Sequence, residues 1–216
     1  INLLDLDYDE LLKFCFRSEF EKFRAKQISQ WLYKKKVDSF DEMKNLPLFL
    51  RGKLNDLAEI KALTVEKKII SKDRSTNKYL FKTFDGFGIE TVELISPDKT
   101  TLCISSQIGC PLRCSFCATG YSGFRRNLKV SEILAQFLFF KKDITNVVFM
   151  GMGEPLLNYG NVMKAIRILN SPDCVNFGAR RITISTSGLP DKIRKLGSEG
   201  LEFNLSISLN ATNDKT

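Results

Sequence analysis

The chain has 216 residues, of which 43% are hydrophobic and 27% charged, a composition that is typical of globular proteins and excludes wholesale disorder. It contains six cysteines and no histidine, which excludes histidine-based acid–base pairs, Ser-His and Cys-His nucleophiles and mixed Cys/His zinc sites. No apolar run approaches the ~20 residues of a membrane span, and Asp5, Asp7 and Asp9 do not fit a signal peptide. We therefore expect a soluble, cytoplasmic protein with no membrane partner.

The net charge of +8 is unevenly distributed along the chain. Residues 1–60 hold 11 basic and 11 acidic side chains, whereas residues 103–216 hold 14 basic and 8 acidic ones. A polyanionic partner fits this distribution, and so does a lysine-rich surface that favours solubility. The run Lys34–Lys36 fits a phosphate contact, but such a run is more often a solvated helix end.

Residues 1–60 predict a small helical unit. Apolar residues recur at helical spacing in Tyr8–Phe16 and Phe23–Tyr33. Ser39 followed by Glu42 is a capping-box pattern that predicts a third helix, and Pro47 precedes a fourth segment at 48–57. The expected buried stripe of the second helix consists of Phe23, Ile28, Trp31 and Leu32.

The pattern changes to alternating strands between about Leu63 and Ile95. Three strands are predicted, at Thr64–Ile70, Lys78–Thr83 and Gly88–Ile95, and the Asp85-Gly86 pair between the last two is a strong hairpin signal. These residues therefore predict a β-hairpin extension.

After Cys103 the pattern alternates between strands and helices. This alternation predicts βαβ units and a parallel sheet or barrel of the α/β class, with an active site at the carboxyl ends of the strands. The expected elements are a helix at Val130–Phe140, a strand at Asn146–Met150, a helix at Val162–Leu169, a strand at Arg181–Ser185, a helix at Asp191–Leu196 and a strand at Glu202–Leu209.

The stretch Cys110-Pro-Leu-Arg-Cys114-Ser-Phe-Cys117 places three cysteines on one short segment. Three thiolates can hold three irons of a [4Fe–4S] cluster and leave the fourth iron open to a substrate. Structural zinc fits less well, because it requires four ligands and the nearest remaining one is Cys103. The spacing thus favours an iron–sulfur cluster.

The same stretch resembles the C-x3-C-x-aromatic-C signature of the radical S-adenosylmethionine (SAM) superfamily. Within it, the chain is similar to the RlmN/Cfr group of RNA adenine methyltransferases over its whole length, and more so to the RlmN type. The motifs that carry this likeness are Thr101–Cys110, Phe124–Leu128, Gly151–Leu156 and Ile184–Gly188. The resemblance implies a truncated, partial (β/α)6 radical-SAM barrel at 103–216, preceded by a helical accessory domain at 1–60 and a β-strand extension at 61–102.

The resemblance also implies the ligands of two cofactors. Cys110, Cys114 and Cys117 would hold the [4Fe–4S] cluster, and SAM would bind its open iron. The residues that match SAM contacts of the family are Gly153, Glu154, Ser185, Ser208, Leu209 and Asn210. Asn210 departs from the family, which usually has histidine there, so a backbone contact with SAM would be kept at this position and a side-chain contact would be changed. Taken alone, the serines fit turns and the glycines fit a loop after a strand.

Two further residues match catalytic positions. Cys103 corresponds to a cysteine that resolves a covalent RNA–enzyme adduct through a transient disulfide bond, and Glu90 to the base that deprotonates this adduct. Without the resemblance, the more common interpretation is a buried strand cysteine for Cys103 and a solvent-facing strand carboxylate for Glu90. Cys15 and Cys174 match no site and are expected to be structural.

The implied reaction is methylation of adenine C2 in 23S ribosomal RNA and transfer RNA through a 5′-deoxyadenosyl radical. The implied partners are these RNAs and an electron donor such as a flavodoxin-type reductant, and the implied state is a monomer. The methyl-carrying cysteine of the family has no counterpart in these 216 residues, so we expect this chain alone not to complete methylation. Two alternatives remain: a non-catalytic RNA-binding remnant, and a different radical-SAM enzyme.

Overall fold

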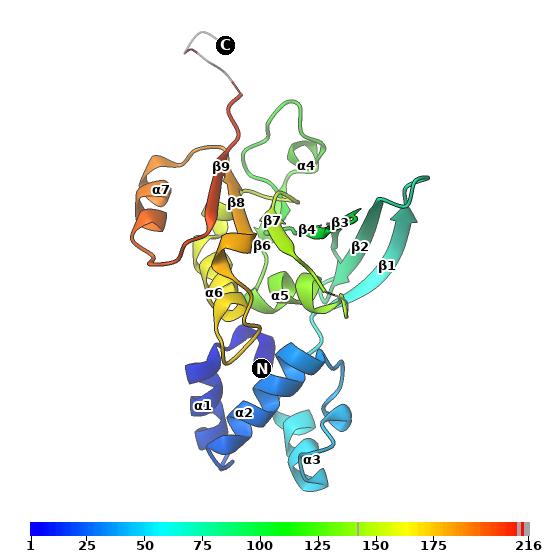
Figure 1. The fold of residues 1–216 in the computed structure, drawn as a ribbon, viewed down its shortest axis with the longest axis vertical. Helices are drawn as coiled ribbons and strands as arrows, with labels where there is room; N and C mark the ends of the chain where they lie inside the picture. Colours follow the sequence, from blue (N-terminus) through cyan, green and yellow to red (C-terminus); the bar gives the residue numbers. More distant parts are fainter. Residues whose placement is uncertain (142, 211–212, 214–216) are drawn as a thin grey trace.

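The computed structural model describes residues 1–141, 143–210 and 213. Its first part is a bundle of short helices, which forms the lower part of the molecule in Figure 1. These elements are η1 (Leu3–Asp5), α1 (Tyr8–Arg17), α2 (Phe23–Ser29), which continues as the π-helical segment η2 (Gln30–Lys35), then η3 (Phe40–Glu42) and α3 (Leu48–Leu57).

Local sequence explains where these helices begin. The Asp7 carboxylate accepts from the Glu10 amide at 2.9 Å and the Glu10 carboxylate accepts from the Asp7 amide at 2.9 Å, so a capping box opens α1. The box predicted at Ser39 is also present, but the helix expected there is only a 3-10 turn, because Met43 leaves helical geometry and is fully buried.

The expected buried stripe is only partly correct. Ile28 and Leu32 are buried, whereas Phe23 is 55% exposed and Trp31 lies at the edge of the core. Phe23 is the first residue of α2, and the Arg24 guanidinium lies 4.5 Å above its ring, so it remains at the surface.

A seven-stranded sheet forms the centre of the molecule, in the order β1-β2-β3-β4-β7-β8-β9. The first four strands are antiparallel neighbours, and β4, β7, β8 and β9 are parallel neighbours. The predicted α/β class is therefore confirmed, and β4 joins the hairpin extension to the parallel part. The strands are β1 (Leu63–Ile70), β2 (Thr76–Thr83), β3 (Gly88–Ser96), β4 (Lys99–Cys103), β7 (Asn146–Phe149), β8 (Ile182–Thr186) and β9 (Asn204–Ile207).

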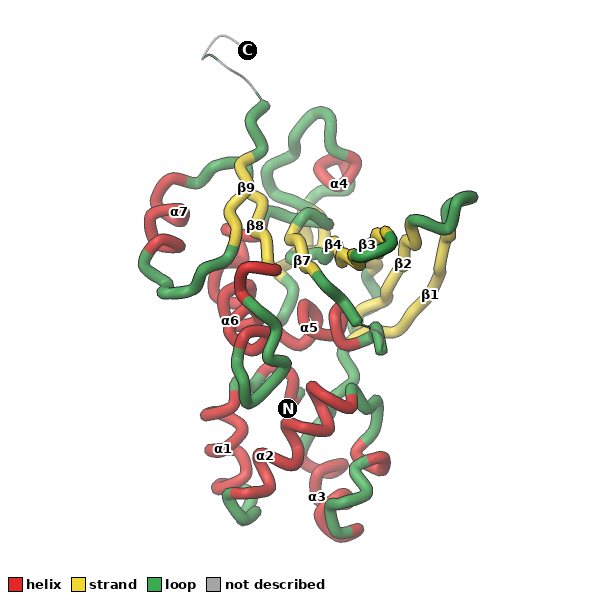
Figure 2. The backbone as a smooth tube through the Cα atoms, viewed as in Figure 1, coloured by secondary structure: helices red, strands yellow, loops and turns green. Residues whose placement is uncertain are grey.

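A separate two-stranded ribbon pairs β5 (Gln107–Gly109) with β6 (Phe124–Asn127), and the short helix α4 (Ala118–Tyr121) lies between its strands. The remaining helices lie between the parallel strands along the chain, as the tube in Figure 2 shows. They are α5 (Val130–Leu138), η4 (Pro155–Asn158), α6 (Tyr159–Asn170), η5 (Ala179–Arg181) and α7 (Pro190–Gly197).

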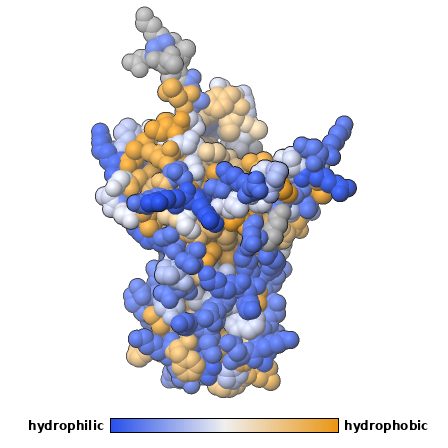
Figure 3. Space-filling view, in the orientation of Figure 1, coloured by the Kyte–Doolittle hydropathy of each residue, from blue (hydrophilic) through white to orange (hydrophobic). Residues whose placement is uncertain are grey.

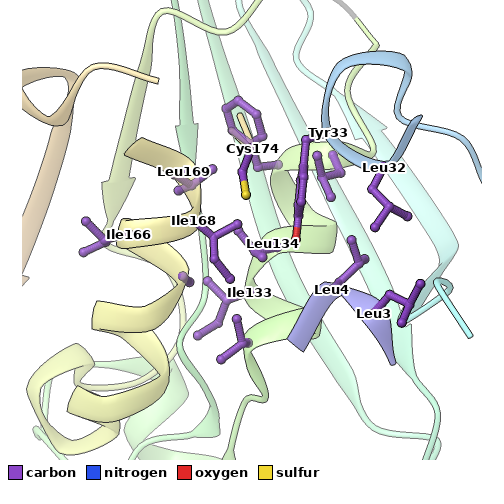
Figure 4. Close-up of a cluster of buried hydrophobic side chains, with 14 of the residues drawn as sticks. Leu3, Leu4, Leu32, Tyr33, Ile133, Leu134, Ile166, Ile168, Leu169 and Cys174 are labelled. Atoms are coloured by element: carbon purple, nitrogen blue, oxygen red, sulfur yellow. The ribbon is translucent and has the colours of Figure 1, made fainter. Parts of the chain in front are cut away.

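Helices α5 and α6 cover one face of the sheet and pack on each other. Figure 4 shows side chains of both helices meeting those of the accessory helices in one buried cluster. The labelled members of this cluster are Leu3, Leu4, Leu32, Tyr33, Ile133, Leu134, Ile166, Ile168, Leu169 and Cys174. The accessory helices are thus packed against the back of the helical layer, away from the other face of the sheet.

Polar contacts fasten the accessory helices to this layer. The Lys34 ammonium donates to the Val175 carbonyl at 2.8 Å, and the Lys36 ammonium donates to the Phe140 carbonyl at 2.6 Å. Lys34 is exposed in the last turn of η2, as expected for a solvated helix end, whereas Lys36 is only partly exposed and departs from that expectation because a carbonyl of the core lies within its reach. Of the helices described, none is long and apolar enough to cross a membrane.

Candidate functional site

Strand register places three of the predicted site residues on the open face of the sheet. Cys103 on β4 is opposite Val92 on β3 and Val148 on β7, and Val148 is opposite Thr183 on β8. Opposite residues share a face, as do residues two apart along a strand. Glu90, Cys103 and Ser185 therefore face the same side of the sheet. The alternate residues face the helices and are buried, namely Leu102, Val147, Phe149, Ile182 and Ile184.

Cys103 is the last residue of β4, at the carboxyl end of the strand. Burial raises the pKa of its thiol to about 11, although a backbone hydrogen bond at Met150 acts in the opposite direction. A thiol with this pKa is protonated at neutral pH and is a weak nucleophile. All six cysteines are free thiols in this structure, so the disulfide bond expected for Cys103 is not supported here.

Glu90 lies one strand away from Cys103. Its carboxylate forms an ion pair with the Lys78 ammonium at 2.9 Å, and both side chains are 44% exposed. Its carbonyl accepts from the Ser105 hydroxyl at 2.6 Å, which links β3 to the segment that follows β4. Contacts of both its side chain and its backbone therefore fix the orientation of Glu90.

The β5–β6 ribbon carries the three clustered cysteines in the loop between its strands. The Cys110 amide donates to the Gly123 carbonyl at 3.1 Å and closes the base of the loop. Gly109 has φ +72°, and a Cβ atom there would lie 1.7 Å from the Gly123 oxygen, so only glycine fits. Within the loop, the Cys117 amide donates to the Cys114 carbonyl at 3.0 Å, which places these two residues in one turn. Figure 1 shows this loop at the same end of the molecule as the carboxyl ends of β7, β8 and β9.

The three thiols are partly exposed. The pKa of Cys110 is raised mainly by burial, and further by the nearby groups of Cys114, Cys117 and Glu154. Within the described residues, no three cysteine, aspartate or glutamate side chains converge as a ready metal site. The donor chemistry nevertheless fits an iron–sulfur cluster, since three soft thiol ligands lie on one short loop without competing histidines.

Backbone hydrogen bonds join the loop that follows β7 to the segment that follows β4. The Gly151 amide donates to the Ile104 carbonyl at 3.1 Å, and the Ser106 amide donates to the Met152 carbonyl at 2.8 Å. A Cβ atom on Gly151 would lie 2.8 Å from the Ile104 backbone, and one on Gly153 would lie 2.5 Å from Gln107 Cβ. Both glycines are therefore needed for this close approach.

Glu154 is buried and joins the β7 loop to the end of β8. One carboxylate oxygen accepts from the Leu156 amide at 3.0 Å, and the other accepts from the Ser187 amide at 2.9 Å. The amide of Glu154 itself donates to the Gln107 side chain at 2.8 Å. Its carboxylate thus shapes the site in this structure, and contact with an ammonium group stays a prediction.

The other predicted SAM contacts lie at the carboxyl ends of β8 and β9. The Ser185 and Ser208 hydroxyl oxygens are 3.4 Å apart, and the Ser208 amide donates to the Thr186 carbonyl at 2.9 Å. The exposed Asn210 side chain donates to the Ser208 carbonyl at 3.2 Å. Leu209 is 75% exposed and extends the apolar surface that Figure 3 shows along β9. The structure therefore brings Ser185, Ser208 and Asn210 together.

Two buried amide side chains that belong to none of the motifs also support the site. The Gln136 side chain accepts from the Ser105 amide at 2.7 Å and donates to the Ser105 carbonyl at 2.9 Å. The Asn158 side chain donates to the Ser106 and Leu128 carbonyls at 2.8 and 2.9 Å. Amides inside otherwise apolar helices, such as Gln136 in α5, are the signal that points to them.

Comparison with known families gives two matches. Residues 1–60 match the model of the ribosomal RNA large subunit methyltransferase N-terminal domain, and residues 104–216 match that of the radical SAM superfamily. The curated relatives include proteins named "Probable dual-specificity RNA methyltransferase RlmN". That of Thermotoga maritima is 51% identical over 214 residues, and that of Petrotoga mobilis is 47% identical over 215 residues.

A crystal structure of a radical SAM methyltransferase from Sphaerobacter thermophilus is also similar, with a TM-score of 0.95 and 41% identity over 99% of this chain. The chain covers 65% of that structure and 62% of each of these two curated relatives, so it spans less than two thirds of their length.

Proposed function

The chain belongs to the radical SAM superfamily, and on that premise we propose that it is the cluster-bearing part of an RNA methyltransferase that modifies adenine C2 in 23S ribosomal RNA and transfer RNA. The observation that carries this proposal is the placement of the three-cysteine loop at the carboxyl edge of the parallel sheet, beside the Gly151–Glu154 loop. The names of the curated relatives support RNA as the substrate class.

Cys110, Cys114 and Cys117 would hold a [4Fe–4S] cluster, and SAM would lie against Gly153, Glu154, Ser185, Ser208, Leu209 and Asn210. Such a cluster supplies one electron for the cleavage of SAM to a 5′-deoxyadenosyl radical. The tight approach of Gly151 to the Ile104 backbone and of Gly153 to Gln107 supports this placement, because the two glycines keep the β7 loop close to the segment that follows β4. The hydroxyl pair Ser185–Ser208 offers hydrogen bonds to a polar ligand.

Cys103 and Glu90 are the proposed catalytic residues of this chain. They face the same side of the sheet, on neighbouring strands, and that side is not covered by α5 or α6. We assign Glu90 the removal of a proton from the RNA adduct and Cys103 its resolution. Lys78 holds the Glu90 carboxylate in place at 2.9 Å. Cys103 would remain a neutral thiol until that step, since burial disfavours its thiolate.

The proposed division of the chain follows its elements, with an accessory domain at 1–60, a β extension at 61–102 and the core at 103–216. Strand β4 spans the last boundary, so the extension and core share one sheet. The excess of basic residues after 103 suits an RNA backbone. A flavodoxin-type reductant, a monomeric state and a cytoplasmic location complete the proposal.

The proposal is tested by anaerobic reconstitution of the chain with iron and sulfide, followed by measurement of iron content and of 5′-deoxyadenosine formed from SAM under reduction. We expect bound iron and sulfide, SAM cleavage by the wild type, and loss of both in Cys114→Ser. Cys174→Ser is the matched control, because Cys174 is buried away from the loop against Ser29. A folded wild-type chain that binds no iron would contradict the proposal.

A further inference from the structure

We propose that Phe84, in the turn between β2 and β3, is a stacking residue for an unpaired base of RNA. This inference rests on the proposed function and assigns part of the RNA-binding surface to named residues. The inference is based on an aromatic side chain that is almost fully exposed to solvent. Phe84 is 99% exposed, compared with 83% for Phe16 and 67% for Phe49 elsewhere on the surface.

The turn that presents Phe84 is internally hydrogen-bonded. The Thr83 amide donates to the Phe87 carbonyl at 2.8 Å, and the Gly86 amide donates to the Thr83 carbonyl at 2.9 Å. The Thr83 hydroxyl donates to the Asp85 carboxylate at 2.7 Å. An exposed ring on a fixed turn loses little conformational freedom when it binds a partner.

Arg126 fixes this turn to the rest of the protein. Its guanidinium donates twice to the Asp85 carboxylate, with both distances 2.7 Å, and twice to the Glu132 carboxylate, at 2.7 and 2.8 Å. Glu132 lies in the first turn of α5, and its side chain is 5% exposed. The turn beside Phe84 is therefore tied both to the ribbon that carries the cysteine loop and to α5.

Two grooves of about 420 and 430 Å³ flank Phe84, and lysines line both. Lys61 lines both grooves, Lys129 the first and Lys82 the second. Among the described residues, Lys82 forms a distant ion pair with Glu66, at 4.0 Å. Three carboxylates line the grooves as well. Two of them are already hydrogen-bonded, Asp5 to the Ser131 amide and Glu132 to Arg126, and the third, Glu59, is exposed to solvent.

A flat ring between lysine-lined grooves matches the chemistry of single-stranded RNA. Bases stack on aromatic rings and phosphates meet lysines, whereas a duplex keeps its bases stacked on each other. The neighbouring Arg125 guanidinium, 6.0 Å from the centre of the Phe87 ring, adds a further cation at the other end of the turn. The turn leads directly into β3, which carries Glu90, so a base at Phe84 would lie at the same end of this strand as the proposed site.

The test measures the affinity of the full chain for a short unstructured RNA and for the same RNA as a duplex, at one fixed salt concentration. We expect Phe84→Ala to weaken single-strand binding about 5- to 100-fold, the range of base–aromatic stacking. Phe84→Trp should restore binding and Phe84→Leu should not, since leucine keeps the apolar character but not the ring. The matched control is Phe49→Ala, at an exposed phenylalanine of α3, which should bind like the wild type.

Several results would overturn the inference. If the wild type binds the single strand and all Phe84 variants bind it equally well, the stacking assignment is wrong while the proposed function stands. If Phe84→Leu binds like the wild type, the contact is apolar and not a stack. If Phe84→Ala converts a dimer to a monomer without RNA, the partner is a second copy. A wild-type chain that binds no RNA contradicts both this inference and the proposed RNA substrate.

Discussion

The Cys103 thiol is held in its neutral form by burial, which raises its pKa to about 11 from an ordinary value of 9.0. We predict that alkylation of Cys103 in the folded protein rises only as the pH approaches 11, as followed by mass spectrometry of the peptide that contains it. In denaturant the same peptide should titrate near 9, which serves as the control. Half-maximal alkylation of the folded protein at pH 9 or below would contradict this account.

The raised pKa of Cys103 makes the free energy of unfolding depend on pH. The folded state favours the protonated Cys103 thiol. The contribution of this thiol to the free energy of unfolding is therefore fully present below its pKa in the unfolded chain and is lost as the pH rises through its pKa in the folded protein. The free energy of unfolding should therefore fall between about pH 9 and 11, and less steeply in Cys103→Ala. Chemical denaturation at a series of pH values measures this difference, and identical slopes in both proteins would contradict it.

Replacing Arg126 should lower the free energy of unfolding more than replacing an arginine whose ion pair is exposed. Arg126→Ala leaves the buried Glu132 carboxylate without its cationic partner, so we expect a loss of about 2–3 kcal/mol in the free energy of unfolding. Arg194→Ala removes an ion pair with Asp191, which is 96% exposed, and should cost less than about 0.5 kcal/mol. Equal denaturation midpoints for the two variants would show that the ion pairs of Arg126 do not contribute to stability.

The sequence predicts which residues carry the chemistry, an assignment that stays a prediction, but it does not reveal what supports them. Glu90, Cys103 and Ser185 were expected at separate places along the chain, and strand register unites them on one face. The roles of Gln136 and Asn158 depend on backbone groups of distant segments, which no local pattern reveals. Likewise, Glu154 was expected to face a ligand, and its two bonds to backbone amides are visible only in three dimensions.

Among the elements, the β5–β6 ribbon depends most on glycine. Gly109→Ala forces a left-handed residue and a contact with the Gly123 carbonyl, so we expect a loss of at least about 1–3 kcal/mol and reduced iron binding. Gly160→Ala is the control, because Gly160 lies in α6 with nothing within 4 Å of its Cβ position. That variant should gain up to about 1 kcal/mol. Denaturation and iron analysis of both proteins would expose a ribbon that tolerates alanine.

Longer elements followed from the sequence and shorter ones did not. Periodicity predicted α1, α5 and the strands of the hairpin extension, because each has enough residues for its spacing to repeat. The three and four residues of β5 and β6 are too few for a pattern, and they pair only because the glycine-closed loop brings them together. The capping box at Ser39 formed as expected, but a cap starts a helix and does not determine its length.

At the scale of the whole molecule, the accessory helices and the core share one hydrophobic cluster. We therefore predict that they unfold together. Trp31, the only tryptophan of the chain, lies in η2 and reports on the accessory helices, while far-ultraviolet circular dichroism reports on the whole chain. The two denaturation curves should coincide. A Trp31 transition at lower denaturant would show that the accessory helices unfold independently.

The central claim is that the three-cysteine loop holds a cluster with an iron that SAM can reach from the carboxyl edge of the sheet. The most direct measurement is electron paramagnetic resonance of the reduced, reconstituted chain with and without SAM. We predict a [4Fe–4S]⁺ signal that changes shape when SAM is added, and that is absent from Cys114→Ser but present in Cys174→Ser. A cluster signal that is identical with and without SAM would contradict the proposed open site.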